Sequence, residues 1–145
     1  MVPLTLRYEG SLHCLAVHGP SGAQLPTDAP RDNMGLGTAF SPTDLVAAAF
    51  ATCTVTTMAI VAKRKGYDLP LVTAEVEKHM SADSPRRVAR IVMCVEIALP
   101  PDHPDRGVLE AAANGCPVHH SLHPELIKEI VFTWNGPPEL NPPMP

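Results

Sequence analysis

The sequence predicts a single α+β domain within its 145 residues. Three observations support this prediction: alternating apolar residues near the N-terminus, one long run without charge in the middle, and two further alternating runs after it. Apolar residues make up 45% and charged residues 18% of the chain, the balance of an ordinary folded domain. We place one domain at residues 1–136 and treat residues 137–145, which contain five prolines, as an extended tail.

The first 18 residues predict a β-hairpin. Leu4, Leu6 and Tyr8 alternate with polar residues, and after a break residues 12–18 continue as a second strand. Glycine and proline are frequent over residues 19–41, which predicts a loop with at most one short strand.

A long helix is predicted from Ser41 to Gly66. Ser41 is a favourable N-cap, Pro42 suits the first helical position, and Asp44 lies in the first turn, where its charge suits the helix dipole. Residues 45–62 are 18 consecutive uncharged residues, the lower limit for a membrane span. Six are alanine and four are threonine, so we interpret the run as a helix buried by its own sheet or by a second copy of the chain, and expect no membrane partner.

Two long strands are predicted at residues 71–80 and 86–99. The apolar face of the second strand consists of Ile91, Met93, Val95, Ile97 and Leu99. Cys94 belongs to the opposite face and is expected to point outward. A helix over residues 105–115, a short helical turn and a last strand over residues 129–134 complete the domain.

Charge and cysteine content exclude several classes of protein. The 11 basic and 15 acidic residues give a net charge of −4 without a basic cluster, so nucleic acid is not an expected partner. The four cysteines, at positions 14, 53, 94 and 116, are widely spaced and form no Cys-x-x-Cys pair, which argues against a disulfide framework and a structural zinc site. No segment of signal-peptide type is present at the N-terminus, so we expect a cytoplasmic protein.

Two of the cysteines are candidates for chemistry. Cys53 lies in the middle of the long helix, where a free cysteine commonly packs as a small apolar residue. Cys116 stands between Gly115 and Pro117 at a predicted helix start, where free backbone N–H groups favour a thiolate. Because the thiolate is the attacking form, this local pattern alone favours Cys116 as the nucleophile.

Both cysteine segments resemble a known family. The segment Phe40–Thr54, which reads FSPTDLVAAAFATCT, and the segment Asn114–His119, which reads NGCPVH, are similar to the two cysteine motifs of the osmotically inducible protein C and organic hydroperoxide resistance (OsmC/Ohr) family. The resemblance covers the chain from the first hairpin to the last strand. It implies an intertwined homodimer in which antiparallel sheets wrap long central helices, with an active site in each half at the dimer interface.

The family resemblance also implies an activity and the roles of the cysteines. Members are thiol peroxidases that reduce organic hydroperoxides in oxidative stress defence. Cys53 would attack the hydroperoxide and become a sulfenic acid, and Cys116 would then form a disulfide with it. An external dithiol would restore the pair, with no bound cofactor. These roles are the reverse of the local interpretation, and we adopt the family assignment.

An arginine and a glutamate assist the nucleophile in family peroxidases. Arg7 and Arg31 are the two candidates for the arginine, and no motif chooses between them. The glutamate of the hydroperoxide reductases lies ten residues before the helix cysteine, and this position is Thr43. Asp44 projects from the opposite side of the helix from Cys53, so we expect it to cap the helix.

Two alternatives remain open. Cys116, His119, His120 and His123 are spaced to share one face of a helix and to bind a transition metal. Four ligands along one helix cannot surround an ion tetrahedrally without strain, so metal binding is the less favoured interpretation. A nearby histidine would instead assist Cys116 as a base or a counter-charge. The other alternative is a non-catalytic stress protein of the same family that binds a small apolar ligand.

Overall fold

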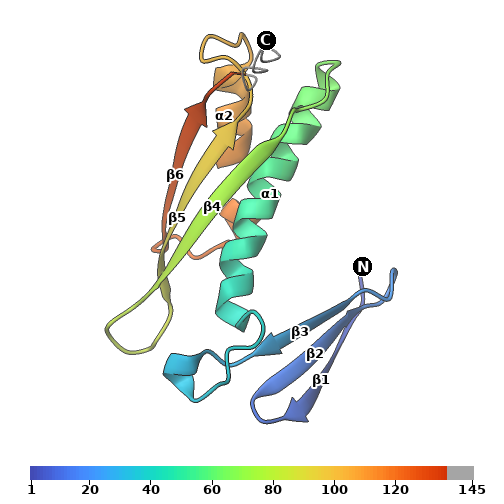
Figure 1. Cartoon of the computed structure of the whole chain (residues 1–145), viewed down its shortest axis with the longest axis vertical. Helices are drawn as coiled ribbons and strands as arrows, with labels where there is room; N and C mark the ends of the chain where they lie inside the picture. The colour runs from blue at the N-terminus through green and yellow to red at the C-terminus, as the bar shows by residue number, and fades with distance from the viewer. Residues whose placement is uncertain (137–145) are drawn as a thin grey trace, which may run out of the picture. The chain divides into compact units, whose positions relative to one another are not determined.

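The computed structural model describes residues 1–136 and shows an α+β protein, as predicted (Figure 1). Strands form two separate three-stranded sheets, and helices follow the first sheet and connect the strands of the second. The chain divides into two compact units, the first spanning Met1–Val46 and the second beginning at Ala47. The predicted tail, residues 137–145, lies outside the described residues.

The first unit contains an antiparallel sheet with the strand order β1-β2-β3. Its strands are β1 (Leu4–Gly10), β2 (His13–His18) and β3 (Gln24–Asp28), so the predicted hairpin and short third strand are confirmed. Ser11 and Leu12, between the first two strands, have positive φ angles of 50° and 63°, the conformation that a tight hairpin turn requires.

The loop after β3 is closed by a buried carboxylate. Asp28 Oδ2 accepts hydrogen bonds from the backbone N–H of Thr38 at 2.9 Å and from its hydroxyl at 2.8 Å. These bonds lower the pKa of Asp28 below its ordinary value. They hold together a segment that includes the short 3-10 helix η1 (Arg31–Asn33) and leads into the long helix.

Helix α1 (Pro42–Arg64) begins and ends close to the predicted positions. The Ser41 hydroxyl accepts the N–H of Asp44 at 3.2 Å, and the Asp44 carboxylate accepts the N–H of Ser41 at 2.7 Å. This reciprocal capping box confirms the predicted role of Asp44. Lys63 and Arg64 lie in the last turn, and Gly66 follows with a φ of 94°.

Within the described chain, α1 is not buried on all sides, so burial of its other faces by a second copy of the chain stays a prediction. Only six of its 23 residues are buried, and they form a stripe at helical spacing: Ala47, Phe50, Ala51, Thr54, Met58 and Ala62. Among the described helices, α1 alone meets the length and apolar composition of a membrane span, a test that the core helix of a soluble protein also passes. The remaining faces of α1 therefore carry apolar surface that the described chain leaves partly uncovered.

The second unit contains a sheet with the strand order β4-β5-β6. Strands β4 (Val72–Met80) and β5 (Val88–Ile97) are antiparallel, as predicted, but β6 (Ile127–Trp134) pairs with β5 in parallel. The expectation of purely antiparallel sheets is therefore wrong for the pair β5 and β6. Helices α2 (Arg106–Asn114) and α3 (Pro117–Ser121) form a crossover that returns the chain to the end of the sheet where β5 begins.

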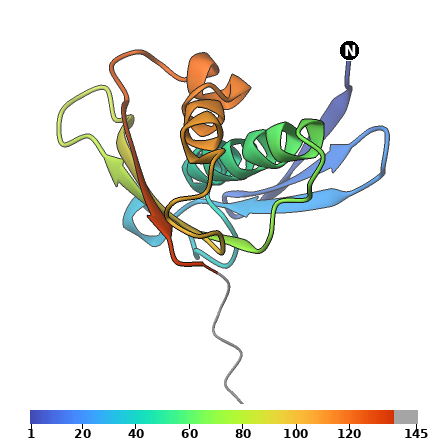
Figure 2. The ribbon, with the colours of Figure 1, turned by 90° about the horizontal axis from the view of Figure 1, so that it is seen from above.

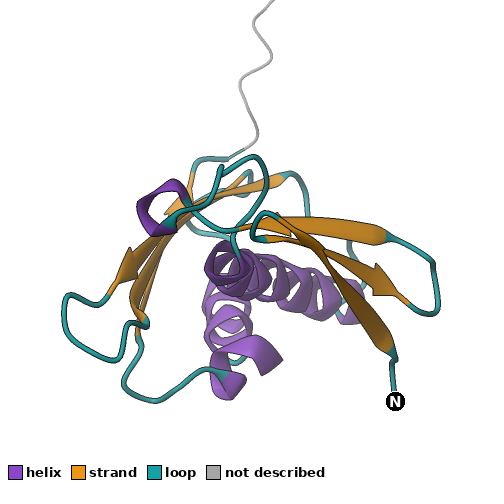
Figure 3. Ribbon diagram, turned by 90° about the horizontal axis from the view of Figure 1, so that it is seen from below, coloured by secondary structure: helices purple, strands orange, loops and turns teal. Residues whose placement is uncertain are grey.

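The core of this unit lies between the sheet and the helices, which cover one face of the sheet (Figures 2 and 3). The inward-facing side chains of β5, each no more than 1% exposed, are Ile91, Met93, Val95 and Ile97. Cys94 is exposed on the opposite face, which confirms the predicted alternation. An ion pair between Lys65 Nζ and Asp105 Oδ1, at 2.8 Å, joins the end of α1 to the start of α2.

Candidate functional site

Cys116 is the N-cap of α3, in agreement with the prediction that it stands at a helix start. Its backbone is extended, with φ −66° and ψ 149°, and Pro117 follows at the first helical position. The sulfur accepts a hydrogen bond from the backbone N–H of His119 at 3.3 Å. The break at Gly115 thus turns the Cys116 side chain into the cap of the next helix.

The Cys116 sulfur contacts α1 beside Cys53. It lies 3.7 Å from Thr54 Oγ1, and both residues are 0% exposed. Because Thr54 directly follows Cys53, the Cys53 Cα lies within about 10 Å of the Cys116 sulfur. Both thiols are free. The fold therefore brings the second cysteine motif against the turn of α1 that carries the first.

The two cysteines differ in burial. Cys53 is only half-buried, whereas Cys116 is fully buried. Side chains advance by about 100° per helical residue, so Cys53 lies beside the buried stripe to which Thr54 belongs. Cys116, although it begins a helix, is covered because that helix start packs against α1.

His119 is the third polar group at this turn. Its ring contacts the buried Phe50 edge to face, with centroids 5.6 Å apart and an interplanar angle of 84°. Its Nδ1 is enclosed and has no hydrogen-bond partner among residues 1–136. Burial, followed by electrostatic interactions with Lys128 and His120, lowers the pKa of His119 below its ordinary value. The imidazole is therefore neutral at pH 7.

The four-ligand face proposed for a metal does not form. Helix α3 ends at Ser121, and Leu122 after it is extended, so His123 leaves the helix on which the spacing depended. His123 Nδ1 accepts the backbone N–H of Glu125 at 3.2 Å. In the part of the chain that the structure describes, no group of three or more His, Cys, Asp or Glu side chains is placed to hold a metal ion.

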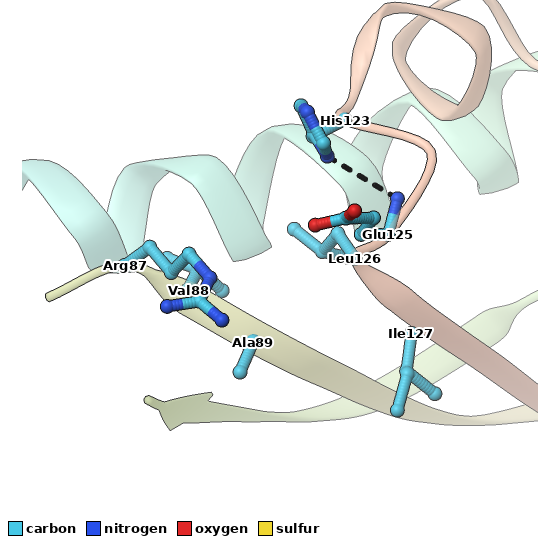
Figure 4. Close-up of a pocket in the computed structure, with 7 residues that line it drawn as sticks. All are labelled: Arg87, Val88, Ala89, His123, Glu125, Leu126 and Ile127. Carbon is cyan, nitrogen blue, oxygen red and sulfur yellow. Dashed lines mark hydrogen bonds between the residues drawn. The ribbon is translucent and has the colours of Figure 1, made fainter. Parts of the chain in front are cut away.

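A separate pocket of about 390 Å³ lies where β5 and β6 begin (Figure 4). Its lining consists of Arg87, Val88, Ala89, His123, Glu125, Leu126 and Ile127. Arg87 is already bound to the carboxylate of Asp83 through both terminal nitrogens. Neither Cys53 nor Cys116 lines this pocket, so it is not the site of the cysteine pair.

Both arginine candidates belong to the first unit. Arg7 is exposed and binds the carboxylate of Glu9, and Arg31 donates from Nε to the carbonyl of Leu36 at 3.2 Å. Their assignment to the site stays a prediction. Thr43, at the position of the family glutamate, has its hydroxyl 3.1 Å from that of Ser41 in the first turn of α1.

Sequence reasoning missed Thr54 and Phe50 as parts of the site. Both belong to the buried stripe of α1, and their spacing of four residues was the signal that would have placed them on one face. What the spacing could not show is that Cys116 and His119 would pack on that face.

The class of this protein is defined by a long helix that carries one cysteine. This helix packs against a second cysteine, which stands at a helix start within the α+β fold. The sequence model of the family described as OsmC-like protein matches residues 35–129. The chain belongs to this family, which confirms the resemblance seen in its cysteine motifs. No curated protein matches the chain.

Solved structures agree with this assignment. A candidate osmotic stress induced and detoxification response protein from Psychrobacter arcticus superimposes with a TM-score of 0.86 at 36% identity, over 92% of this chain and 96% of that chain. The organic hydroperoxide resistance protein OsmC of Legionella pneumophila has a TM-score of 0.74 at 16% identity, over 92% and 96%. OhrB of Bacillus subtilis, an organic hydroperoxide resistance protein, has a TM-score of 0.67 at 15% identity, over 92% and 98%. The last two share the fold with this chain.

Proposed function

We propose that this protein is a thiol-dependent peroxidase that reduces organic hydroperoxides in oxidative stress defence. The observation that carries the proposal is the contact of the Cys116 sulfur with Thr54, next to Cys53. Membership of the OsmC-like family supports it, as do the structural neighbours that are named for organic hydroperoxide resistance.

In the first half-reaction, the Cys53 thiolate attacks the terminal oxygen of the hydroperoxide. A sulfur–oxygen bond forms, the oxygen–oxygen bond breaks, and the alkoxide takes up a proton and leaves as an alcohol. Cys53 is thereby oxidised to a sulfenic acid. Its partial exposure supports this role, because a substrate from solution can reach it more readily than the enclosed Cys116.

In the second half-reaction, the Cys116 sulfur attacks the Cys53 sulfur. The disulfide forms, the sulfur–oxygen bond breaks, and the hydroxide leaves as water with the proton that Cys116 loses. A disulfide needs Cα atoms within about 7 Å, so a modest approach of α3 to the flank of α1 completes the bond. An external dithiol then reduces the pair by thiol–disulfide exchange, without a bound cofactor.

We also propose that the protein acts as an intertwined homodimer in the cytoplasm. Leu4, Leu6 and Tyr8, which share one face of β1, are 70%, 71% and 61% exposed. Helix α1 is buried on one stripe alone. Exposed apolar faces of this kind are typical of protein–protein interfaces, and a second copy of the chain would cover them. In that dimer, Arg7 or Arg31 would polarise the hydroperoxide.

The proposal is tested by steady-state turnover of tert-butyl hydroperoxide with dithiothreitol as the reductant. Cys53→Ser should abolish turnover. Cys116→Ser should still form one sulfenic acid per chain, which dimedone traps, but no intramolecular disulfide. Cys94→Ser is the matched control, because Cys94 is exposed on the outer face of the sheet, and it should retain full activity. Turnover in Cys53→Ser equal to that of the wild type would overturn the assignment.

One observation favours the non-catalytic alternative, namely the complete enclosure of Cys116. A family member that only binds a small apolar ligand would keep both thiols reduced when it is mixed with one equivalent of hydroperoxide. Counting free thiols by mass spectrometry after alkylation under denaturing conditions separates the two functions.

A further inference from the structure

Cys53, Cys116 and His119 meet within little more than one turn of α1. The Cys116 sulfur contacts Thr54, and the His119 ring contacts Phe50, four residues earlier on the same face. Four helical residues correspond to a rise of about 6 Å, so the sulfur and the imidazole lie at neighbouring positions along α1. Cys53 lies between Phe50 and Thr54 in sequence, on the flank of this face.

The start of α3 places His119 directly beside the sulfur. His119 is three residues after Cys116, and its backbone N–H donates a hydrogen bond to the Cys116 sulfur at 3.3 Å. Helical side chains lean toward the N-terminus of their helix, which here is the Cys116 end. The edge-to-face contact with Phe50 holds the ring in this orientation.

One ring nitrogen of His119 is enclosed but contributes no hydrogen bond to the described fold. Nδ1 is inaccessible to solvent and has no partner among the described residues, while the residue as a whole retains partial exposure. An enclosed, unpaired nitrogen destabilises a fold, so such a group calls for an explanation. A proton-transfer role supplies one, because an imidazole on a partly exposed residue next to an enclosed sulfur can accept and release protons.

We propose that His119 is the general base for Cys116 when the disulfide forms. This inference rests on the proposed peroxidase function. The imidazole accepts the proton of the Cys116 thiol as the sulfur attacks the sulfenic acid of Cys53. The imidazolium then returns the proton to the departing hydroxide, so the step yields one disulfide and one water and leaves His119 neutral.

The charges around His119 favour its neutral form. Burial opposes its protonation most, followed by Lys128 on β6 and His120 on α3, and the Cys116 thiol accepts the backbone N–H of the same residue. A neutral imidazole at pH 7 is ready to accept a proton. In the wild type, the rate of disulfide formation should therefore rise with pH through a midpoint below about 6.5 and then level off.

The test is a single-turnover experiment with one equivalent of tert-butyl hydroperoxide, quenched with acid and analysed by mass spectrometry. In His119→Asn, the loss of the Cys53 thiol should keep its wild-type rate. Disulfide formation should slow by about 100-fold near pH 7, and the sulfenic acid should accumulate for dimedone to trap. The pH midpoint below about 6.5 should disappear from the rate profile.

His120→Asn is the matched control, because His120 is the neighbouring exposed histidine on α3, and its disulfide rate at pH 7 should match the wild type. Equal disulfide rates and pH profiles in His119→Asn and the wild type would overturn the inference alone. A wild type whose Cys53 resists oxidation would overturn the peroxidase function and the inference with it.

If the His119→Asn variant fails to fold, the wild-type protein provides the test of the general base. Its disulfide rate profile is compared with the titration of the His119 ring followed by NMR. Coincident midpoints support the general base, whereas a rate that follows no titration below pH 8 overturns it.

Discussion

Thr54 Oγ1 lies 3.7 Å from the Cys116 sulfur, although the two residues are 62 positions apart in the chain. The contact joins the start of α3 to the middle of α1, directly beside Cys53. It gives the two cysteine motifs a shared location, and the proposed disulfide chemistry depends on it. The expected consequences of this contact and of four other features can each be measured.

Replacing the buried hydroxyl should affect disulfide formation more than the fold. Thr54→Val removes a hydrogen-bonding group from the Cys116 sulfur while keeping a similar shape, so the free energy of unfolding should fall by about 1 kcal/mol. The disulfide should form several-fold more slowly, as measured by single-turnover mass spectrometry. Thr52→Val is the control, because Thr52 is exposed on the same helix. Equal slowing in both variants would contradict a specific role for Thr54.

The capping box should contribute measurably to stability. Ser41→Ala removes the side chain that accepts the N–H of Asp44, so the free energy of unfolding should fall by about 1 kcal/mol in urea titrations. Thr5→Ala, a change at an exposed strand residue, should have an effect within about 0.5 kcal/mol. If the two variants were equally stable, the observed cap would be energetically neutral.

His119 should make stability depend on pH. Its pKa is lowered in the folded state, so the unfolded chain binds more protons between that lowered pKa and about 6.5. The contribution of His119 is complete above about pH 6.5 and is lost as the pH falls through the folded-state pKa. Urea unfolding at pH 8 and pH 5 should show a smaller stability difference in His119→Asn than in the wild type. An unchanged difference would mean that burial of the imidazole does not penalise its charge.

The buried carboxylate of Asp28, in the first unit, should also make stability depend on pH. Because the pKa of Asp28 is lowered, its stabilising effect is present above the ordinary value of about 3.8 and is lost as the pH falls through the folded-state pKa. Asp28→Asn should therefore flatten the acid limb of the unfolding curve, as measured by circular dichroism between pH 6 and pH 2. An unchanged acid limb in Asp28→Asn would mean that another carboxylate is responsible for it.

The exposed face of β1 should control the oligomeric state. The wild type should sediment as a dimer, and Leu6→Glu should shift it toward monomer, with at least a tenfold higher dissociation constant, because a charge replaces an apolar side chain in the interface. Thr5→Glu, on the opposite face of the same strand, should leave the dimer intact. Sedimentation of the wild type as a monomer would contradict the proposed assembly.

The sequence alone determined most of the elements, because these depend on neighbouring residues. The cap at Ser41, the break before Pro117 and the outward direction of Cys94 all follow from local hydrogen bonding, proline geometry and strand alternation. The family of the chain was also accessible, through the two cysteine motifs.

Only the tertiary structure decided how these elements meet. The parallel pairing of β6, the end of α3 before His123 and the burial of Cys116 depend on how the crossover packs against α1 and the sheet. The contacts of Cys116 with Thr54 and of His119 with Phe50 join segments more than 60 residues apart. Periodicity reports which face of an element is apolar, whereas the partner of that face is set by packing of the whole chain, and local patterns carry no record of it.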